Sequence, residues 1–140
     1  MILSKNLSKA FNEQVEAEMW SSNLYLSMSI YFQKAGLNGC ARWMRKQAEE
    51  EREHAHKMID FAIDRGGDIV INQINVVPTA WGTPLEVFEH VYKHEVHVSE
   101  LIDKMVDIAE ADNDHAAKDF LYGFVREQVE EESTAKAIVD

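Results

Sequence analysis

Apolar residues recur every three or four positions along four long stretches of the chain, which is the spacing of an amphipathic helix. Glycines, prolines and one polar run, ADNDH, separate these stretches. We therefore predict helices near residues 5–34, 38–65, 83–111 and 115–140. The apolar positions that define them are Leu7, Phe11, Tyr25, Met28 and Phe32, then Met44, Ala48, Ala55, Met58 and Ala62, then Phe88, Tyr92, Ile102 and Val106, and last Ala117, Leu121, Phe124, Ala135 and Ile138.

The segment GGDIVINQINVVPTAWG, residues 66–82, joins the second predicted helix to the third. Its valines and isoleucines favour an extended path, and 17 extended residues reach about 55 Å at about 3.3 Å each. A helix of about 28 residues is about 42 Å long, so the segment is long enough to cross the whole bundle. The pattern predicts an all-α four-helix bundle with one long crossover between helices 2 and 3. A small β-hairpin insert is the alternative for this segment.

Each predicted apolar stripe is interrupted near its middle by polar side chains that fall on the inward face. The interruptions repeat, since 33 residues separate Glu18 from Glu51 and also Glu95 from Gln128. A shift of 77 residues relates the polar positions of the first half of the chain to those of the second: Glu18 to Glu95, Glu51 to Gln128 and His54 to Glu131. Antiparallel packing about the two short turns would bring all of these side chains to one height. The full set is Glu18, Glu51, His54, Glu95, Gln128 and Glu131.

Four carboxylates buried in one layer would destabilise a core unless a cation lay among them. The stripes contain no inward lysine or arginine, so we infer that the cation is a metal. Oxygen-rich ligation with a single imidazole suits iron or manganese, and two ions are the natural count for four carboxylates. Taken singly, an inward glutamate is more often a boundary residue whose head reaches water.

The composition bounds the remaining function classes. The chain has 140 residues, the length of one compact domain, so we expect a single domain over residues 1–140. Its net charge of −11 argues against a nucleic-acid surface and favours cations as partners. Cys40 is the only cysteine, which excludes a disulfide framework and makes the cytoplasm the expected location. We find neither a secretion signal nor the roughly 20 apolar residues that span a membrane.

Four segments resemble those of bacterial non-haem ferritins in order and spacing: NEQVEAEMWSSNLY, AEEEREHAHKM, YKHEVHV and REQVEEE. The resemblance covers nearly the whole chain. It implies a protein that binds Fe²⁺ at a paired site in each subunit, oxidises it with O₂ or H₂O₂, and stores Fe³⁺ in a hollow homo-oligomer of 24 subunits. Carried over by position, the first iron would be held by Glu18, Glu51 and His54, with Glu51 bridging, and the second would be served by Glu95, Gln128 and Glu131.

Gln128 stands where symmetric di-iron enzymes and bacterioferritins have a charged residue. A weaker ligand would hold the second iron less firmly, which suits a site whose product must leave. The resemblance also implies that Tyr25 hydrogen-bonds Glu95 and donates an electron during oxidation, although a core tyrosine with a satisfied hydroxyl is an equal interpretation. Bacterioferritins have their axial methionine directly after the helix-two glutamate, where this chain has Arg52. We therefore predict no haem.

A third iron site, on the way to the storage cavity, is a further implication of the resemblance. The third site would also use Glu131, which belongs to the paired site. Plain solvated acids are the alternative interpretation, and it is the one that we assign to Glu49 and Glu53. The residues of the third site would be Glu50, Glu127 and Glu130.

Bacterial ferritins continue past the fourth helix into a short fifth helix that lines the four-fold axis of the shell, whereas this sequence ends at STAKAIVD. We expect the fifth helix to be absent, and three explanations are open: the chain was shortened, its last residues are disordered and missing from this sequence, or this member lacks the helix. The iron site does not depend on that helix, but the four-fold contacts do. A closed shell, a shell with open four-fold channels and dimers packed along the first two helices are therefore alternatives.

Three rival classes share parts of this pattern. A rubrerythrin-like di-iron peroxidase without mineral storage is disfavoured by the single cysteine and by Gln128. A DNA-protecting mini-ferritin has a metal site shared between subunits, and the acidic chain offers no affinity for phosphate. In a helical interaction protein the inward glutamates would be a coincidence, which the 77-residue repeat disfavours.

Overall fold

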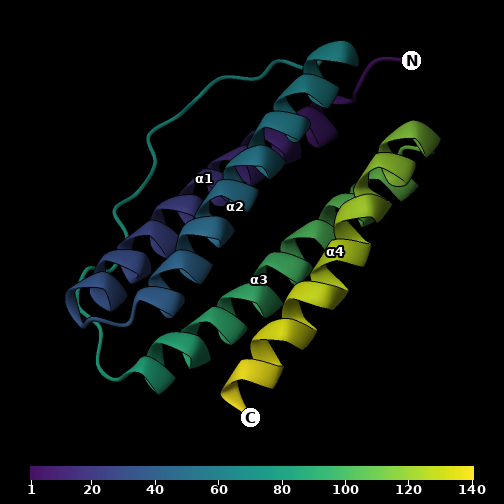
Figure 1. Cartoon of the computed structure of the whole chain (residues 1–140). Coiled ribbons are helices and arrows are strands. Elements are labelled where there is room, and N and C mark those ends of the chain that lie inside the picture. Colours follow the sequence, from purple (N-terminus) through teal and green to yellow (C-terminus); the bar gives the residue numbers. More distant parts are fainter.

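Four long helices and the segments between them make up the computed structural model, which describes residues 1–140. α1 (Lys5–Lys34) pairs with α2 (Asn38–Asp64), and α3 (Pro84–Ala111) pairs with α4 (His115–Val139) (Figure 1). The predicted all-α four-helix bundle is confirmed, and every helix end lies within one residue of its predicted place. None of the four helices has an apolar stretch of the length and hydropathy that crossing a bilayer requires.

The helix ends coincide with capping residues that are visible in the sequence. The side chains of Ser4 and Thr83 accept hydrogen bonds from backbone N–H groups in the first turns of α1 and α3. α1 and α2 are followed by Gly36 and Gly66, whose φ angles of +77° and +73° lie in the left-handed region. Glycine adopts this conformation without strain, so both helices stop where the sequence permits a sharp turn.

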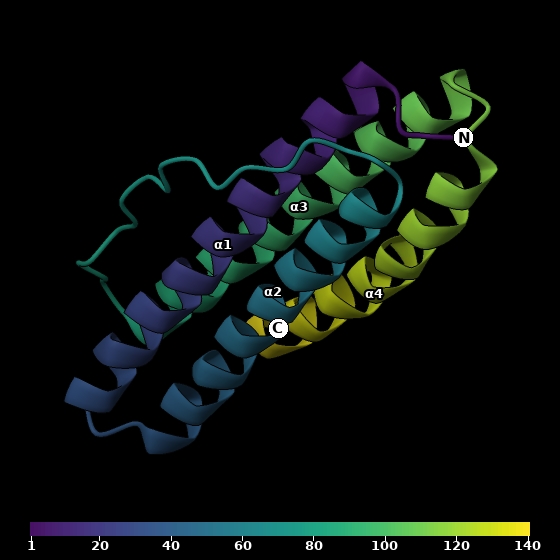
Figure 2. The same ribbon diagram turned by 90° about the horizontal axis from the view of Figure 1, so that it is seen from above.

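The crossover between α2 and α3 runs along the outside of α1 for most of its length (Figures 1 and 2). It contains no β-strand, so the hairpin alternative is wrong. Four of its carbonyl groups instead accept hydrogen bonds from α1 side chains spaced one or two turns apart, which satisfies part of an extended backbone that has no partner strand. These bonds run from Asn12 to Asp68 at 2.6 Å, from Trp20 to Val76 at 3.2 Å, from Ser27 to Pro78 at 2.6 Å and from Tyr31 to Gly82 at 2.8 Å.

A polar layer divides the core of the bundle into two apolar halves. One half is a cluster of 14 buried residues and the other a cluster of 11. On α1 the first half takes Leu7, Phe11 and Val15, and the second begins at Leu24, which leaves Glu18 between them. The other three helices show the same gap in their stripes. The polar positions predicted from the sequence fall in this gap, as antiparallel packing requires.

One end of the bundle is tied together by an ion pair between Arg65 and Asp114, with Nη2 and Oδ2 2.8 Å apart. Asp114 is buried and also caps α4 by accepting a hydrogen bond from the Ala117 N–H at 3.1 Å. The Arg65 Nε group donates to the Met1 carbonyl at 3.0 Å, so the N-terminal residues join the same cluster. Burial alone would raise the pKa of Asp114, but the bonds from Arg65 and Ala117 outweigh it and hold that pKa below its usual value.

Substitutions at Asp114 separate the helix cap from the ion pair. Asp114→Asn keeps a capping side chain but removes the charge that faces Arg65, whereas Asp114→Ala removes both. We expect the alanine variant to lower the unfolding free energy by about 2–4 kcal/mol and the asparagine variant by less. Urea unfolding followed by circular dichroism measures both values, and equal losses in the two variants would contradict a separate capping role.

The same variants have an expected pH dependence. The folded-state pKa of Asp114 is depressed, so its stabilising effect is present above the unfolded value of 3.8 and is lost as pH falls through the lower folded value. The difference in stability between wild type and Asp114→Asn should therefore narrow when unfolding is measured at pH 3 instead of pH 7. A difference that stays constant would show that the ion pair does not stabilise the fold.

Candidate metal centre

The polar layer contains one group of side chains whose ligand atoms all lie within 4.8 Å of one another: Glu18, Glu51 and His54. Glu18 comes from α1, and the other two lie one turn apart on the inward face of α2. His54 Nδ1 is 3.7 Å from Glu18 Oε2 and 3.5 Å from Glu51 Oε2. These separations exceed ordinary hydrogen bonds, and the three atoms surround a common point.

Two carboxylate oxygens of this group have no partner. Glu18 Oε2 and Glu51 Oε2 are buried and accept no hydrogen bond, although the other oxygen of Glu18 accepts one from Gln14 Nε2 at 3.0 Å. Unpaired buried oxygens are costly, and native structures keep few of them without a reason. Two carboxylates and one imidazole nitrogen converging on one point are a donor set that fits Fe²⁺, which would displace a proton from the imidazole on binding.

The electrostatics of the group reflect crowded negative charge. Burial and the neighbouring Glu18 charge raise the pKa of Glu51 well above its usual range. Burial acts in the same direction on Glu18, but the nearby Glu51 and His54 and the hydrogen bond from Gln14 outweigh it and lower the pKa of Glu18. Burial opposes the charge on His54, yet the two carboxylates prevail and raise the pKa of His54 to about 11. In the absence of a metal ion, protons on Glu51 and His54 therefore balance the negative charge of the group.

Glu95 and Gln128 complete the layer from α3 and α4. Tyr25 donates its hydroxyl proton to Glu95 Oε1, which is the hydrogen bond that the sequence resemblance implies. Gln128 Nε2 lies 3.1 Å from Glu95 Oε2 and 3.2 Å from Ser99 Oγ, so it donates toward both. Burial, followed by the Glu95 charge, raises the pKa of Tyr25 well above its usual value. The tyrosine is therefore a neutral donor that orients Glu95.

Glu131 and the acids predicted for a third site lie at the flank of this layer. Burial, together with the charges of Glu95 and Glu50, raises the pKa of Glu131 to about 7. Glu127 Oε2 lies 2.8 Å from His54 Nε2, on the opposite side of the ring from Glu18 and Glu51. A carboxylate behind a histidine fixes which nitrogen faces the site, so Glu127 turns His54 Nδ1 inward. Glu130 is exposed.

The apolar pattern missed three polar residues that adjoin the centre. Gln14 precedes Glu18 by one helical turn, and this spacing within NEQVEAE was the available signal. Ser99 lies one turn after Glu95 and accepts from Gln128. His94 falls off the inward stripe of α3, yet it is buried and burial lowers its pKa to about 4. No periodicity argument places His94, because it faces the seam between α1 and α3.

Comparisons with known proteins identify the family of the chain. The family model for the ferritin-like domain matches residues 8–140. The bacterial non-heme ferritin of Bacteroides fragilis (strain 638R) is 62% identical over 139 residues, covering 99% of this chain and 87% of that protein. A bacterial non-heme ferritin of Campylobacter jejuni is 33% identical, covering 99% of this chain and 83% of the relative.

Among solved structures, the open pore ferritin from the hyperthermophilic archaeon Archaeoglobus fulgidus superposes with a TM-score of 0.96 at 45% identity. The superposition covers 98% of this chain and 84% of the archaeal one. Sequence identity and fold agree over almost the entire length, and the chain belongs to the ferritin-like family.

Proposed function

We propose that this protein is an iron-storage ferroxidase, which binds Fe²⁺ in the polar layer, oxidises it with O₂ or H₂O₂ and stores the Fe³⁺ product as a mineral. The observation that carries the proposal is the pair of unpartnered buried oxygens, Glu18 Oε2 and Glu51 Oε2, beside His54 Nδ1. Such atoms destabilise a fold unless a proton or a metal cation joins them. The family membership favours iron as that cation.

Two Fe²⁺ ions would share the layer as substrates. The first would be bound by Glu18, Glu51 and His54 through the three converging atoms. The second would be served by Glu95, Gln128 and Glu131, with Glu51 bridging the two ions. Each Fe²⁺ gives up one electron to the oxidant, and the surrounding carboxylates favour the product because a higher positive charge is stabilised more strongly by fixed negative charge.

Tyr25 is placed to assist this oxidation. Its hydroxyl already donates to Glu95 Oε1, so loss of an electron from the ring would be accompanied by transfer of the proton to that carboxylate. The ring is fully buried, which keeps bulk water from the phenol. A role as electron donor is therefore compatible with the geometry, as is a purely orienting role.

The flank acids would receive iron after oxidation. Glu50 and Glu127 are close enough to Glu131 for their charges to raise its pKa, so the three form a continuous negative path away from the paired site. Glu130, one position before Glu131 on α4, would extend that path at the surface. This arrangement supports a third iron site on the way to a storage cavity.

Mineral storage requires assembly, and we propose that the chain forms a hollow homo-oligomer. Leu26 and Ile30 lie one turn apart on α1, and both are exposed in the single chain. Val76 of the crossover is exposed as well. Exposed apolar side chains on adjacent turns of a helix are typical of surfaces that become covered by another subunit.

Removing one converging oxygen tests the centre. We expect Glu51→Ala to lose stoichiometric Fe²⁺ binding, about two ions per chain in the wild type, and to slow oxidation by more than about 100-fold. Anaerobic Fe²⁺ titration followed by addition of air, monitored by absorbance, measures both. The matched control is Glu53→Ala, which removes an exposed carboxylate from the same helix and should behave as wild type. Equal binding by the two variants would remove the metal argument.

Gln128→Glu tests why the second half of the layer contains an amide. The variant replaces a donor 3.1 Å from Glu95 Oε2 with a second carboxylate, so without iron it should melt at a lower temperature than wild type. With iron, the added charge should hold the second ion longer without slowing oxidation. Differential scanning calorimetry and the rate of Fe³⁺ transfer out of the centre measure the two effects. Unchanged retention would count against the release role of Gln128.

A further inference from the structure

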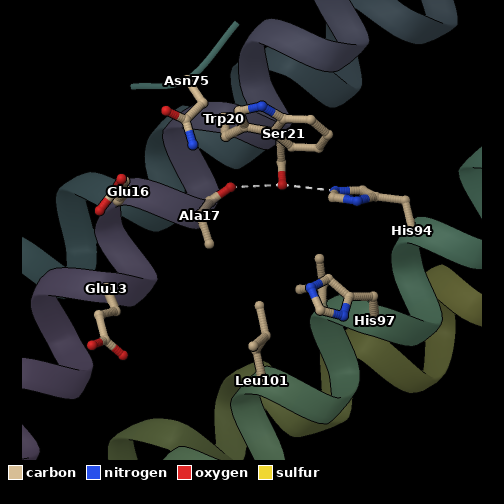
Figure 3. A pocket seen from close by; sticks show the side chains of 10 residues that line it. Glu13, Glu16, Ala17, Trp20, Ser21, Asn75, His94, His97 and Leu101 are labelled. Atoms are coloured by element: carbon tan, nitrogen blue, oxygen red, sulfur yellow. Dashed lines mark hydrogen bonds between the residues drawn. The ribbon is translucent and has the colours of Figure 1, made fainter. Parts of the chain in front are cut away.

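A pocket of about 410 Å³ opens on the outer side of the seam between α1 and α3, away from the flank acids. Glu13 and Glu16 line it from α1, and His94 and His97 line it from α3 (Figure 3). Asn75 of the crossover closes one edge. Figure 3 shows these side chains around a common opening, with Glu13 and Glu16 on successive turns of the same helix. Nothing in the proposed oxidation uses this pocket.

The inner wall of the pocket offers one unpartnered ligand atom. Ser21 Oγ has a single proton, which it donates to the Ala17 carbonyl at 2.8 Å. The Ser21 oxygen must therefore accept from His94 Nε2, 2.8 Å away, so the neutral ring carries its proton on Nε2 (Figure 3). His94 Nδ1 is left as a lone pair with no hydrogen-bond donor. The side chain is only 9% exposed, so this lone pair belongs to a built wall and not to a mobile surface group.

Charge and size together indicate what the pocket would take. Its ten lining residues include two carboxylates and no lysine or arginine, so it attracts cations. The ligand atoms do not gather within the 4.8 Å that marks the Glu18–Glu51–His54 group, so a bare ion is not chelated here. A divalent ion with six waters needs about 200 Å³ at about 30 Å³ per water, which the pocket holds with room to spare. Lone pairs and carboxylates would then bind the water shell.

The pocket is separated from the centre by one layer of side chains. The His94 ring lies edge-on to the Tyr25 ring, with centroids 6.1 Å apart, and Tyr25 donates to Glu95. Ser21, at the pocket wall, follows Glu18 by one turn of α1. The charge of Glu18 also acts on His94, where it opposes the fall in the pKa of that imidazole. An ion held in the pocket is therefore next to the helices that supply both halves of the centre.

We infer that this pocket is an outer capture site for hydrated divalent cations, from which Fe²⁺ enters the centre through the seam between α1 and α3. The inference rests on the proposed ferroxidase function. Glu13 and Glu16 would attract the ion, while His94 Nδ1 and His97 would bind its water shell. The pocket thus acts on the rate at which iron arrives and not on the number of ions bound.

The test measures arrival separately from oxidation. Air does not oxidise Co²⁺ during the measurement, and the absorbance of Co²⁺ changes when carboxylate and imidazole ligands replace its water. Stopped-flow mixing of Co²⁺ with the full chain therefore reports the rate of entry. The variants are the double substitution Glu13→Gln/Glu16→Gln and the filling substitution Ala17→Leu. The control Glu49→Gln/Glu53→Gln makes the same change in net charge on exposed positions of α2.

We expect the Glu13→Gln/Glu16→Gln variant to slow Co²⁺ arrival and Fe²⁺ oxidation three- to tenfold at low ionic strength, with the difference shrinking as salt is added. Ala17→Leu should slow both at any salt concentration. The number of ions bound at saturation should stay at the wild-type value in every variant. Rates equal to those of the Glu49→Gln/Glu53→Gln control would overturn the capture site.

Two further outcomes separate the possible failures. If Ala17→Leu slows the oxidation of iron that is already bound but leaves Co²⁺ arrival unchanged, the pocket admits the oxidant and the cation inference is wrong. If the wild-type chain itself binds neither Fe²⁺ nor Co²⁺ stoichiometrically, the proposed ferroxidase function fails, and the capture site fails with it.

Discussion

The constraint on which the structure depends is the burial of several carboxylates at one height in a helical bundle. Glu18, Glu51 and Glu95 lie in a layer where no lysine or arginine side chain reaches them, so only protons or added cations offset their charge. The layer interrupts the core and leaves two apolar clusters, one on each side. Each apolar cluster must stabilise the packing of the four helices at its own end of the bundle, because the polar layer between the clusters contributes little hydrophobic stabilisation. Long helices and firm caps are therefore a condition for keeping the site.

Much of the fold follows from local sequence, and the reason is that its signals are local. Ser4, Thr83 and Gly36 act on the turns next to them, so the helix ends could be placed to within one residue. The shared height of the polar positions follows from the intervals of 33 and 77 residues, since antiparallel helices joined by short turns have little freedom of register. The path of the crossover was predictable only in outline. Its course along α1 depends on side-chain donors such as Asn12 and Trp20, whose partners lie 56 residues away.

The parts of the site that could not be predicted lie off the inward stripes. A stripe analysis assigns each helix one inward direction, whereas a bundle has a centre and also seams between neighbouring helices. His94 points into the seam between α1 and α3, so its burial depends on how closely those two helices pack. Gln14 and Ser99 support ligands from one turn away, and polar residues at such positions are indistinguishable from solvated ones until the neighbouring helix is in place.

The repeat in the sequence does not make the two halves of the layer equivalent. Glu18 and Glu51 each keep one buried oxygen free, whereas both oxygens of Glu95 are engaged, one by Tyr25 and the other by Gln128. An ion approaching Glu95 must therefore displace or share existing hydrogen bonds, while an ion approaching Glu18 and Glu51 relieves two unpaired lone pairs. The protein groups alone thus favour filling of the first position before the second. The proposed iron storage would benefit from such an order, because the ion that is bound second and more weakly would also be the first to move on.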